Sequence, residues 1–372
     1  MDTSSASLNS QQGGDGNPHR RLREMHGPHR KHLSAALGMI LWAWLVLAPI
    51  PGSAQGGVSL KSRQQAMEAF AALLKIPLSA PPVSVTVRES EEEDGLVVED
   101  VSWISLDDER VPAFVIRPKA ASGPLPAIVC LHGSSGSRES ETTRQFGMGP
   151  WTRYGAKESH QRLLGWAREL SRRGYLTLTL TQRGLDRRLP DTNDQAKDLL
   201  VRGRTLMGAL VYEIRQGLTY LQSRPDVDSR KMGMTGMSFG GITTFYTWLV
   251  DDRIAAAAPI CGGVGSVDVF LKIGSRGYHG FYWWVPNMLT KGDQGDFAAA
   301  MVPRPLMLWA PLDDIGMPRQ GVERFLEVVE PAYSKANARK NLLAHRPPGP
   351  HEFTLEAFEA MQKFFDDRLK GH

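Results

Sequence analysis

The sequence predicts an α/β fold, with a mostly parallel central sheet of about eight strands and helices on both faces. From residue 127 onward, short apolar runs alternate with longer stretches of helical periodicity. Strands that alternate with helices form parallel sheets, because each crossover returns the chain to the same edge. Several of the runs are wholly apolar, which is typical of strands covered on both faces.

The first expected elements are a helix and an antiparallel meander. Residues 59–76 carry apolar side chains at helical spacing, and Pro77 ends the pattern. The next three segments alternate or are apolar and β-branched, which predicts strands at one edge of the sheet: 84–88, 96–105 and 110–117.

The remaining elements follow in alternation. The expected strands are 127–131, 174–181, 231–235, 254–260, 305–310 and 341–345. The expected helices are 161–173, 197–223, 242–250, 320–333 and 355–369. Residues 137–158 are polar with several glycines, which is typical of a loop or lid. We therefore expect a single catalytic domain in residues 55–372.

Residues 1–54 have the pattern of a polar tail followed by a secretory signal. A basic cluster ends at Lys31, residues 35–48 are a 14-residue uncharged apolar run, and Gly52 and Ala54 permit cleavage after Ala54. The run is shorter than the roughly 20 apolar residues that a membrane-spanning helix needs. We expect export to the periplasm or the medium, with an uncleaved membrane anchor as the alternative.

Composition argues against several other classes of protein. The hydrophobic fraction of 41% and charged fraction of 23% are ordinary for a globular domain. The net charge of +4 gives no footprint for nucleic acid. The two cysteines, Cys130 and Cys261, form no CxxC pattern, and there is no HExxH. We therefore expect neither a metal nor another cofactor.

The segment from Gly236 to Gly240 matches G-x-S-x-G around Ser238. This motif is a sharp turn between a strand and a helix, which lifts the serine hydroxyl out of the sheet at a helix N-terminus. The residues two before and two after the serine must be small, because larger side chains would collide. A predicted strand precedes the motif and a predicted helix follows it, so Ser238 is the expected nucleophile.

A serine hydroxyl needs a base to take its proton, and the base needs a carboxylate to hold its tautomer. His351 lies in a loop between the last strand and the last helix, and it is favoured as the base over His345. Two acids, Asp313 and Asp314, follow the strand 305–310. Asp314 is favoured and Asp313 stays open. The order of serine, acid and histidine is that of α/β-hydrolases.

The oxyanion of such a reaction needs two backbone N–H donors. Phe239, directly after the nucleophile, is expected to supply one of them. Ser134, which follows His132-Gly133 after the strand 127–131, is expected to supply the other. We expect His132 to brace this loop rather than to act as the base.

At these motifs the chain resembles the dienelactone hydrolase and acetyl-xylan esterase branches of the α/β-hydrolase superfamily. The matching stretches are 126–137 (PAIVCLHGSSGS), 223–241, 301–318 and 348–369. The resemblance implies ester hydrolysis through an acyl-enzyme on Ser238, with a small-molecule or carbohydrate ester as substrate. Dienelactone hydrolases proper carry cysteine at this position, so lactone opening of their kind is not implied.

Two alternatives remain open. One is a prolyl-oligopeptidase-like serine peptidase, although residues 55–83 leave no room for the propeller that usually precedes that domain. The other is a non-catalytic binding protein of the same fold, which normally shows a broken triad.

The resemblance also makes predictions for the cysteines. The superfamily's strand order places one strand between those of Cys130 and Cys261, so the two would be roughly 9–10 Å apart. A disulfide needs Cα atoms within about 7 Å, so two free thiols are expected.

An aromatic segment lies between two late strands. Residues 276–284 include Trp283 and Trp284, which we expect either to line the substrate pocket or to cap the domain core. Trp151 and Tyr154 are weaker candidates for the pocket.

Overall fold

A computed structural model describes residues 60, 62–134, 152–154, 162–185, 188 and 190–371, all in the compact unit Gln55–His372. The predicted tail and signal in residues 1–54 lie outside the described residues, as do Trp151 and most of the predicted loop 137–158. Residues 152–154, 162 and 163 are described in their backbone only. Among the described residues, no helix is long and apolar enough to cross a bilayer.

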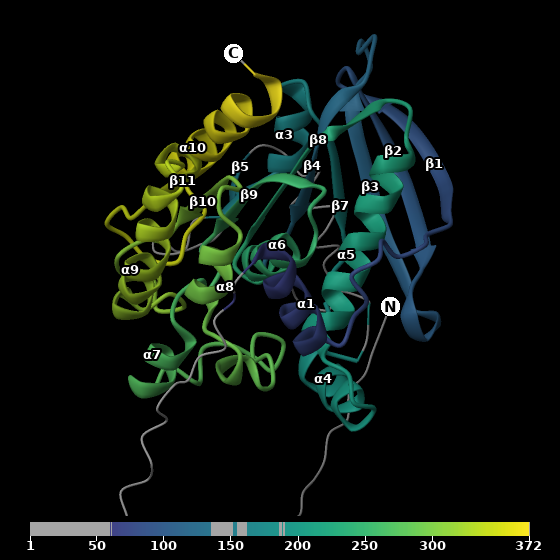
Figure 1. The fold of residues 1–372 in the computed structure, drawn as a ribbon. Coiled ribbons are helices and arrows are strands. Elements are labelled where there is room, and N and C mark those ends of the chain that lie inside the picture. The colour runs from purple at the N-terminus through teal and green to yellow at the C-terminus, as the bar shows by residue number, and fades with distance from the viewer. Residues whose placement is uncertain are drawn as a thin grey trace, which may run out of the picture. The chain divides into compact units, whose positions relative to one another are not determined.

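A nine-stranded sheet forms the centre of the described residues, in the order β1-β2-β3-β7-β4-β8-β9-β10-β11 (Figure 1). Neighbours from β1 to β7 pair antiparallel, and all later pairs, from β7–β4 to β10–β11, are parallel. The strands are β1 Val85–Glu93, β2 Leu96–Ile104, β3 Arg110–Pro118, β4 Leu125–Leu131, β7 Leu176–Leu180, β8 Val227–Met237, β9 Ile254–Ile260, β10 Leu306–Trp309 and β11 Leu342–His345. The predicted mostly parallel sheet is confirmed.

Helices cover both faces of this sheet, as predicted (Figure 1). One layer packs into the larger core cluster and consists of α1 Arg63–Leu74, α5 Leu206–Ser223, α6 Phe239–Val250, α8 Gln294–Ala300 and α9 Arg319–Lys335. The other layer consists of α3 Trp166–Arg172 and α10 Leu355–Phe365, which continues into a π-helical turn at Asp366–Lys370.

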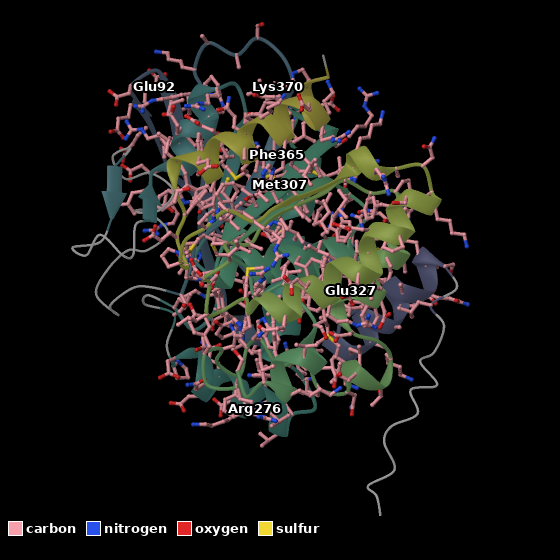
Figure 2. All side chains as sticks on the ribbon, turned by 90° about the vertical axis from the view of Figure 1, so that its left-hand side faces the viewer. Glu92, Arg276, Met307, Glu327, Phe365 and Lys370 are labelled. Atoms are coloured by element: carbon pink, nitrogen blue, oxygen red, sulfur yellow. The ribbon has the colours of Figure 1, made fainter. Side chains whose placement is uncertain are left out.

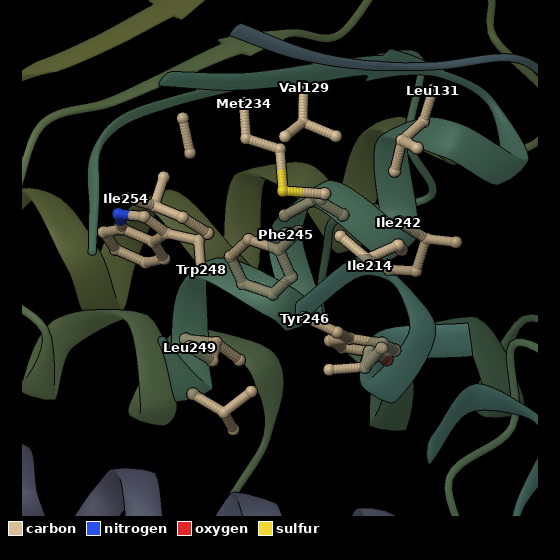
Figure 3. Close-up of a cluster of buried hydrophobic side chains, with 14 of the residues drawn as sticks. Val129, Leu131, Ile214, Met234, Ile242, Phe245, Tyr246, Trp248, Leu249 and Ile254 are labelled. Atoms are coloured by element: carbon tan, nitrogen blue, oxygen red, sulfur yellow. The ribbon is translucent and has the colours of Figure 1, made fainter. Parts of the chain in front are cut away.

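Helix α6 is the centre of the larger core cluster. Figure 3 shows its Phe245 and Trp248 beneath Val129 of β4 and Met234 of β8, all of them buried. Phe245 also stacks on Trp248 at a centroid distance of 6.2 Å. On the opposite face Phe365 of α10 and Met307 of β10 belong to a second buried cluster (Figure 2). Burial on both sides holds β8 and the start of α6 rigidly in place.

Two predicted helices have different bounds. The expected helix 197–223 is two helices, α4 Thr192–Val201 and α5, because Gly203 adopts a φ of +71° and Thr205 caps α5. The expected helix 161–173 begins only at Trp166. Before it, β6 Arg162–Leu164 pairs antiparallel with β5 Thr152–Tyr154. Strand β5 lies inside residues 137–158, which were predicted to be a loop.

Two helices between β9 and β10 were not predicted. Helix α7, Val267–Lys272, and helix α8 have 6 and 7 residues, too few for a clear helical period. Ser266 caps α7, and Asp293 with Asp296 forms a capping box on α8. Short 3-10 turns complete the fold at Leu106–Asp108, Met288–Thr290 and Arg339–Asn341.

Candidate active site

Ser238 stands at the turn between β8 and α6, in a backbone conformation that non-glycine residues rarely adopt, with φ 56° and ψ −112°. The turn is tight because a Cβ on Gly236 would lie 2.4 Å from the carbonyl oxygen of Gly240, and a Cβ on Gly240 would lie 2.2 Å from that of Leu131. The small residues of the motif are therefore required by backbone packing, as the sequence predicted.

Three side chains from three loops meet at this turn. His351 Nε2 lies 2.8 Å from Ser238 Oγ, and His351 Nδ1 lies 2.8 and 2.9 Å from the two carboxylate oxygens of Asp314. Asp314 follows β10 and is 2% exposed, and His351 follows β11 and is 6% exposed. An ionised carboxylate only accepts, so Nδ1 carries the proton and Nε2 is free to accept from the serine hydroxyl.

The structure distinguishes the two acids. Asp314 also accepts a hydrogen bond of 2.7 Å from the backbone N–H of Gly316, which fixes its carboxylate. Residues 310–318, between β10 and α9, are called the acid loop below. Asp313 of this loop is exposed and accepts a hydrogen bond of 3.1 Å from the backbone N–H of Gly349, so it links the acid loop to the loop of His351. His345 stacks on Trp309 at a centroid distance of 5.6 Å instead of joining the site.

The two expected oxyanion donors lie beside the serine. Phe239 is the first residue of α6, and an N–H at that position has no acceptor within its own helix. The loop of Ser134 passes next to the nucleophile, since a Cβ on Gly133 would come within 3.5 Å of Ser238 Cβ. This geometry is compatible with both backbone groups facing an oxygen bound at Ser238.

A buried network braces the loop of Ser134. His132 Nε2 accepts from the backbone N–H of Gln182 at 3.2 Å, and the Gln182 amide donates to the carbonyl oxygen of His132 at 2.7 Å. Thr243 of α6 donates to the Gln182 side chain at 2.8 Å. The bracing role expected of His132 matches these contacts. Gln182 was missed, although its place directly after a strand of the parallel sheet is a usable signal.

The aromatic segment has two parts with different surroundings. Trp283 is completely buried, and it stacks on His279 at 4.6 Å and packs against Phe270. Trp284 is half-buried and donates to the carbonyl oxygen of His279. Of the two expected roles, core packing describes Trp283 in this structure, and a substrate contact stays a prediction for Trp284. Tyr278 lies nearer to the expected base, because the centroid of its ring is 5.7 Å from that of the His351 ring.

Cys130 on β4 and Cys261 after β9 are buried and form no disulfide, with β8 between their strands, so the prediction of two unbridged thiols is confirmed. Within the described part of the chain, one group of side chains is close enough to hold a metal ion, namely Cys261, Asp314 and His351, whose ligand atoms lie within 4.8 Å. Asp314 and His351 already bond to each other there, and their acid–base arrangement needs no metal.

Sequence comparison identifies a relative of this chain but no family model. No family model matches the chain. A Bacillus subtilis (strain 168) protein described as "Putative hydrolase YtaP" is 28% identical over 288 residues, which cover 76% of this chain and 93% of that protein.

Two solved structures illustrate the structural likeness. A glucuronoyl esterase from Solibacter usitatus is 16% identical with a TM-score of 0.62, covering 82% of this chain and 91% of that chain. An acetyl xylan esterase from Paenibacillus sp. R4 is 17% identical with a TM-score of 0.57, covering 82% and 93%. Likeness at these identities establishes the fold alone.

The sheet order, the strand–turn–helix at Ser238 and these likenesses define the class of protein. The chain has the α/β-hydrolase fold, as its sequence predicted, and its structural neighbours include acetyl xylan and glucuronoyl esterases.

Proposed function

We propose that this protein is a serine esterase that cleaves carboxylic esters through an acyl-enzyme on Ser238. One observation carries the proposal: an unbroken series of hydrogen bonds runs from Ser238 Oγ through His351 to the buried carboxylate of Asp314. This arrangement activates a hydroxyl for attack on a carbonyl carbon.

In the acylation step, Ser238 Oγ forms a bond to the ester carbonyl carbon as its proton passes to His351 Nε2. The resulting oxyanion accepts hydrogen bonds from the N–H groups of Phe239 and Ser134, each worth about 3–4 kcal/mol to the transition state. The carbon–oxygen bond to the alcohol then breaks, and His351 gives its proton to the leaving alkoxide. Asp314 keeps the imidazole oriented and stabilises its positive charge.

In the deacylation step, water takes the place of the alcohol. His351 Nε2 removes a proton from the water as its oxygen attacks the acyl carbon, and the same two N–H groups hold the second oxyanion. The bond to Ser238 Oγ breaks and the serine recovers its proton from His351. The products are the free carboxylic acid and the original enzyme, and the cycle needs no cofactor.

The names of the structural neighbours support a substrate class. Acetyl xylan and glucuronoyl esterases act on esters of carbohydrates by their names, and they share this chain's fold. We therefore propose a carbohydrate ester or another small carboxylic ester as the substrate. A peptidase or a binding protein without activity has no comparable support among these neighbours.

The test is hydrolysis of p-nitrophenyl acetate, butyrate and octanoate by the full chain and by Ser238→Ala. We expect the variant to lose at least about 10³-fold in kcat, because the acyl-enzyme cannot form. Circular dichroism checks that both proteins are folded. Equal turnover in the two proteins would remove Ser238 as the nucleophile, and folded protein inactive on all three esters would favour the binding alternative.

The proposal includes export. The basic cluster, the apolar run and the small residues at 52 and 54 support a signal peptide cleaved after Ala54. N-terminal sequencing of protein made in a secreting host would then begin at Gln55, whereas an intact N-terminus would favour the membrane anchor.

A further inference from the structure

The acid loop is held from outside by the segment between α7 and α8. His279 Nε2 lies 2.8 Å from the carbonyl oxygen of Gly316. Gly316 in turn donates its N–H to Asp314 Oδ1 at 2.7 Å. A single residue thus separates His279 from the carboxylate that contacts His351.

Gly316 lies in a turn that is closed by a hydrogen bond of 3.0 Å from the N–H of Met317 to the carbonyl oxygen of Asp314, and it has no side chain of its own to hold its peptide groups. A Cβ at this position would lie 2.3 Å from Cε1 of Tyr278, so the aromatic ring occupies the space. A glycine turn can adopt many conformations, and an external hydrogen bond selects the one that aims its N–H at Asp314.

His279 itself is held firmly. Its ring stacks on Trp283 with an interplanar angle of 7°, and its carbonyl oxygen accepts from Trp284 Nε1 at 3.3 Å. Trp283 is completely buried and packs against Phe270 in the core. The imidazole is therefore anchored to the body of the domain and not to a loop alone.

The direction of the hydrogen bond follows from the chemistry of its partner. The Gly316 carbonyl oxygen can only accept, so His279 Nε2 carries a proton. Burial lowers the pKa of His279 to about 4, although its hydrogen bond to the Gly316 carbonyl and the carboxylate of Asp314 act in the opposite direction. The ring is thus neutral at pH 7 and places no extra positive charge beside the proposed base.

We propose that His279 is a positioning residue, which orients Asp314 by fixing the backbone of Gly316. This inference rests on the proposed function, since it assigns His279 to the same Asp314–His351 pair. His279 has no contact with the reacting atoms in this account. It acts through the hydrogen bond to the acid loop.

The test compares two substitutions at one position. His279→Phe keeps an aromatic ring on Trp283 but removes the donor, and His279→Gln removes the ring but keeps an N–H donor. We expect H279F to lower kcat by about 10- to 100-fold with KM unchanged. Losses of this size are typical when a residue that orients a functional side chain through hydrogen bonds is removed. H279Q should recover most of this loss. His345→Phe is the matched control, because His345 also stacks on a tryptophan, whereas the ring that bonds to the Gly316 carbonyl is that of His279.

A second readout is independent of turnover. The strongly deshielded proton of His351 Nδ1, seen by NMR, reports its hydrogen bond to Asp314, and Asp314→Asn assigns it by its loss. We expect H279F to broaden or shift this signal, and H279Q and H345F to preserve it. Folded H279F with normal kcat and an unchanged signal would overturn the proposal, as would H279Q impaired as much as H279F.

Should H279F not fold, His279→Met replaces it, because Met and Gln have similar length and differ in the amide donor. Equal kcat in H279Q and H279M would then overturn the role of the hydrogen bond.

The variant Ser238→Ala distinguishes a failure of the proposed esterase function from a failure of the role proposed for His279. Turnover that survives S238A refutes the proposed function, while loss in S238A with no effect of H279F refutes only the role of His279.

Discussion

At the scale of single residues, the site depends on which of two adjacent carboxylates faces the histidine. Asp314 is buried and bonds to His351 and Gly316, whereas Asp313 is exposed and bonds to Gly349. Both side chains therefore have partners, but only one can hold the tautomer of the proposed base. The other joins two loops of the site.

We expect Asp314→Asn to lower kcat for p-nitrophenyl acetate by about 10⁴-fold, because an amide no longer holds the required tautomer. Asp313→Asn should lower it by less than about tenfold, since one exposed hydrogen bond contributes about 1 kcal/mol. Steady-state kinetics on the two purified variants measures both. The reverse order of effects would assign the acid to Asp313.

At the scale of elements, the unit that matters is β8, the turn at Ser238 and α6. Its conformation is costly for Ser238, so the neighbouring elements must hold it. The backbone of Gly240 lies against Leu131 at the end of β4, and Gly241 lies against Gly262 after β9. A Cβ on either glycine would lie within 2.6 Å of these backbone atoms, so the first turn of α6 has no space for a side chain there.

We expect Gly240→Ala to lower the free energy of unfolding by about 3 kcal/mol or more, because its Cβ would meet backbone atoms that cannot move away. Urea denaturation followed by circular dichroism measures it. Gly123→Ala is the control, since a Cβ there meets nothing within 4 Å. Similar unfolding midpoints for both variants would show that the turn is looser than described.

At the scale of the whole domain, a buried ionic cluster connects the segment after β7 to helix α5. Glu213 of α5 is 1% exposed and bonds to Arg183 at 2.8 Å and to Arg188 at 2.8 and 2.9 Å. Arg188 also reaches Glu109 before β3. Because Gln182 belongs to the same loop as Arg183, the cluster also supports the brace of the proposed oxyanion loop.

We expect Glu213→Gln to lower the free energy of unfolding by about 3–5 kcal/mol, because it removes the buried carboxylate and leaves Arg183 and Arg188 only the more exposed Asp107 and Glu109. Glu323→Gln breaks an exposed pair with Arg319 and should leave stability unchanged. Thermal and urea unfolding of the two variants measure the difference. A stable E213Q would mean that water enters the cluster.

The sequence by itself determined the class of fold, the strand–turn–helix around Ser238 and the loops that carry the proposed acid and base. These features follow from local rules: apolar periodicity, small residues around a tight turn, and strands whose carboxyl ends meet at one edge of a sheet. The break between α4 and α5 and the short helices α7 and α8 escaped prediction, since caps and tertiary packing decide them rather than periodicity.

Only the tertiary structure decided which side chains in those loops meet. The choice of Asp314, the burial of Trp283, the brace at Gln182 and the contact of His279 with Gly316 join residues far apart in the chain. Local patterns place a residue at an edge of the sheet, but the direction of its side chain depends on what packs against it from other elements.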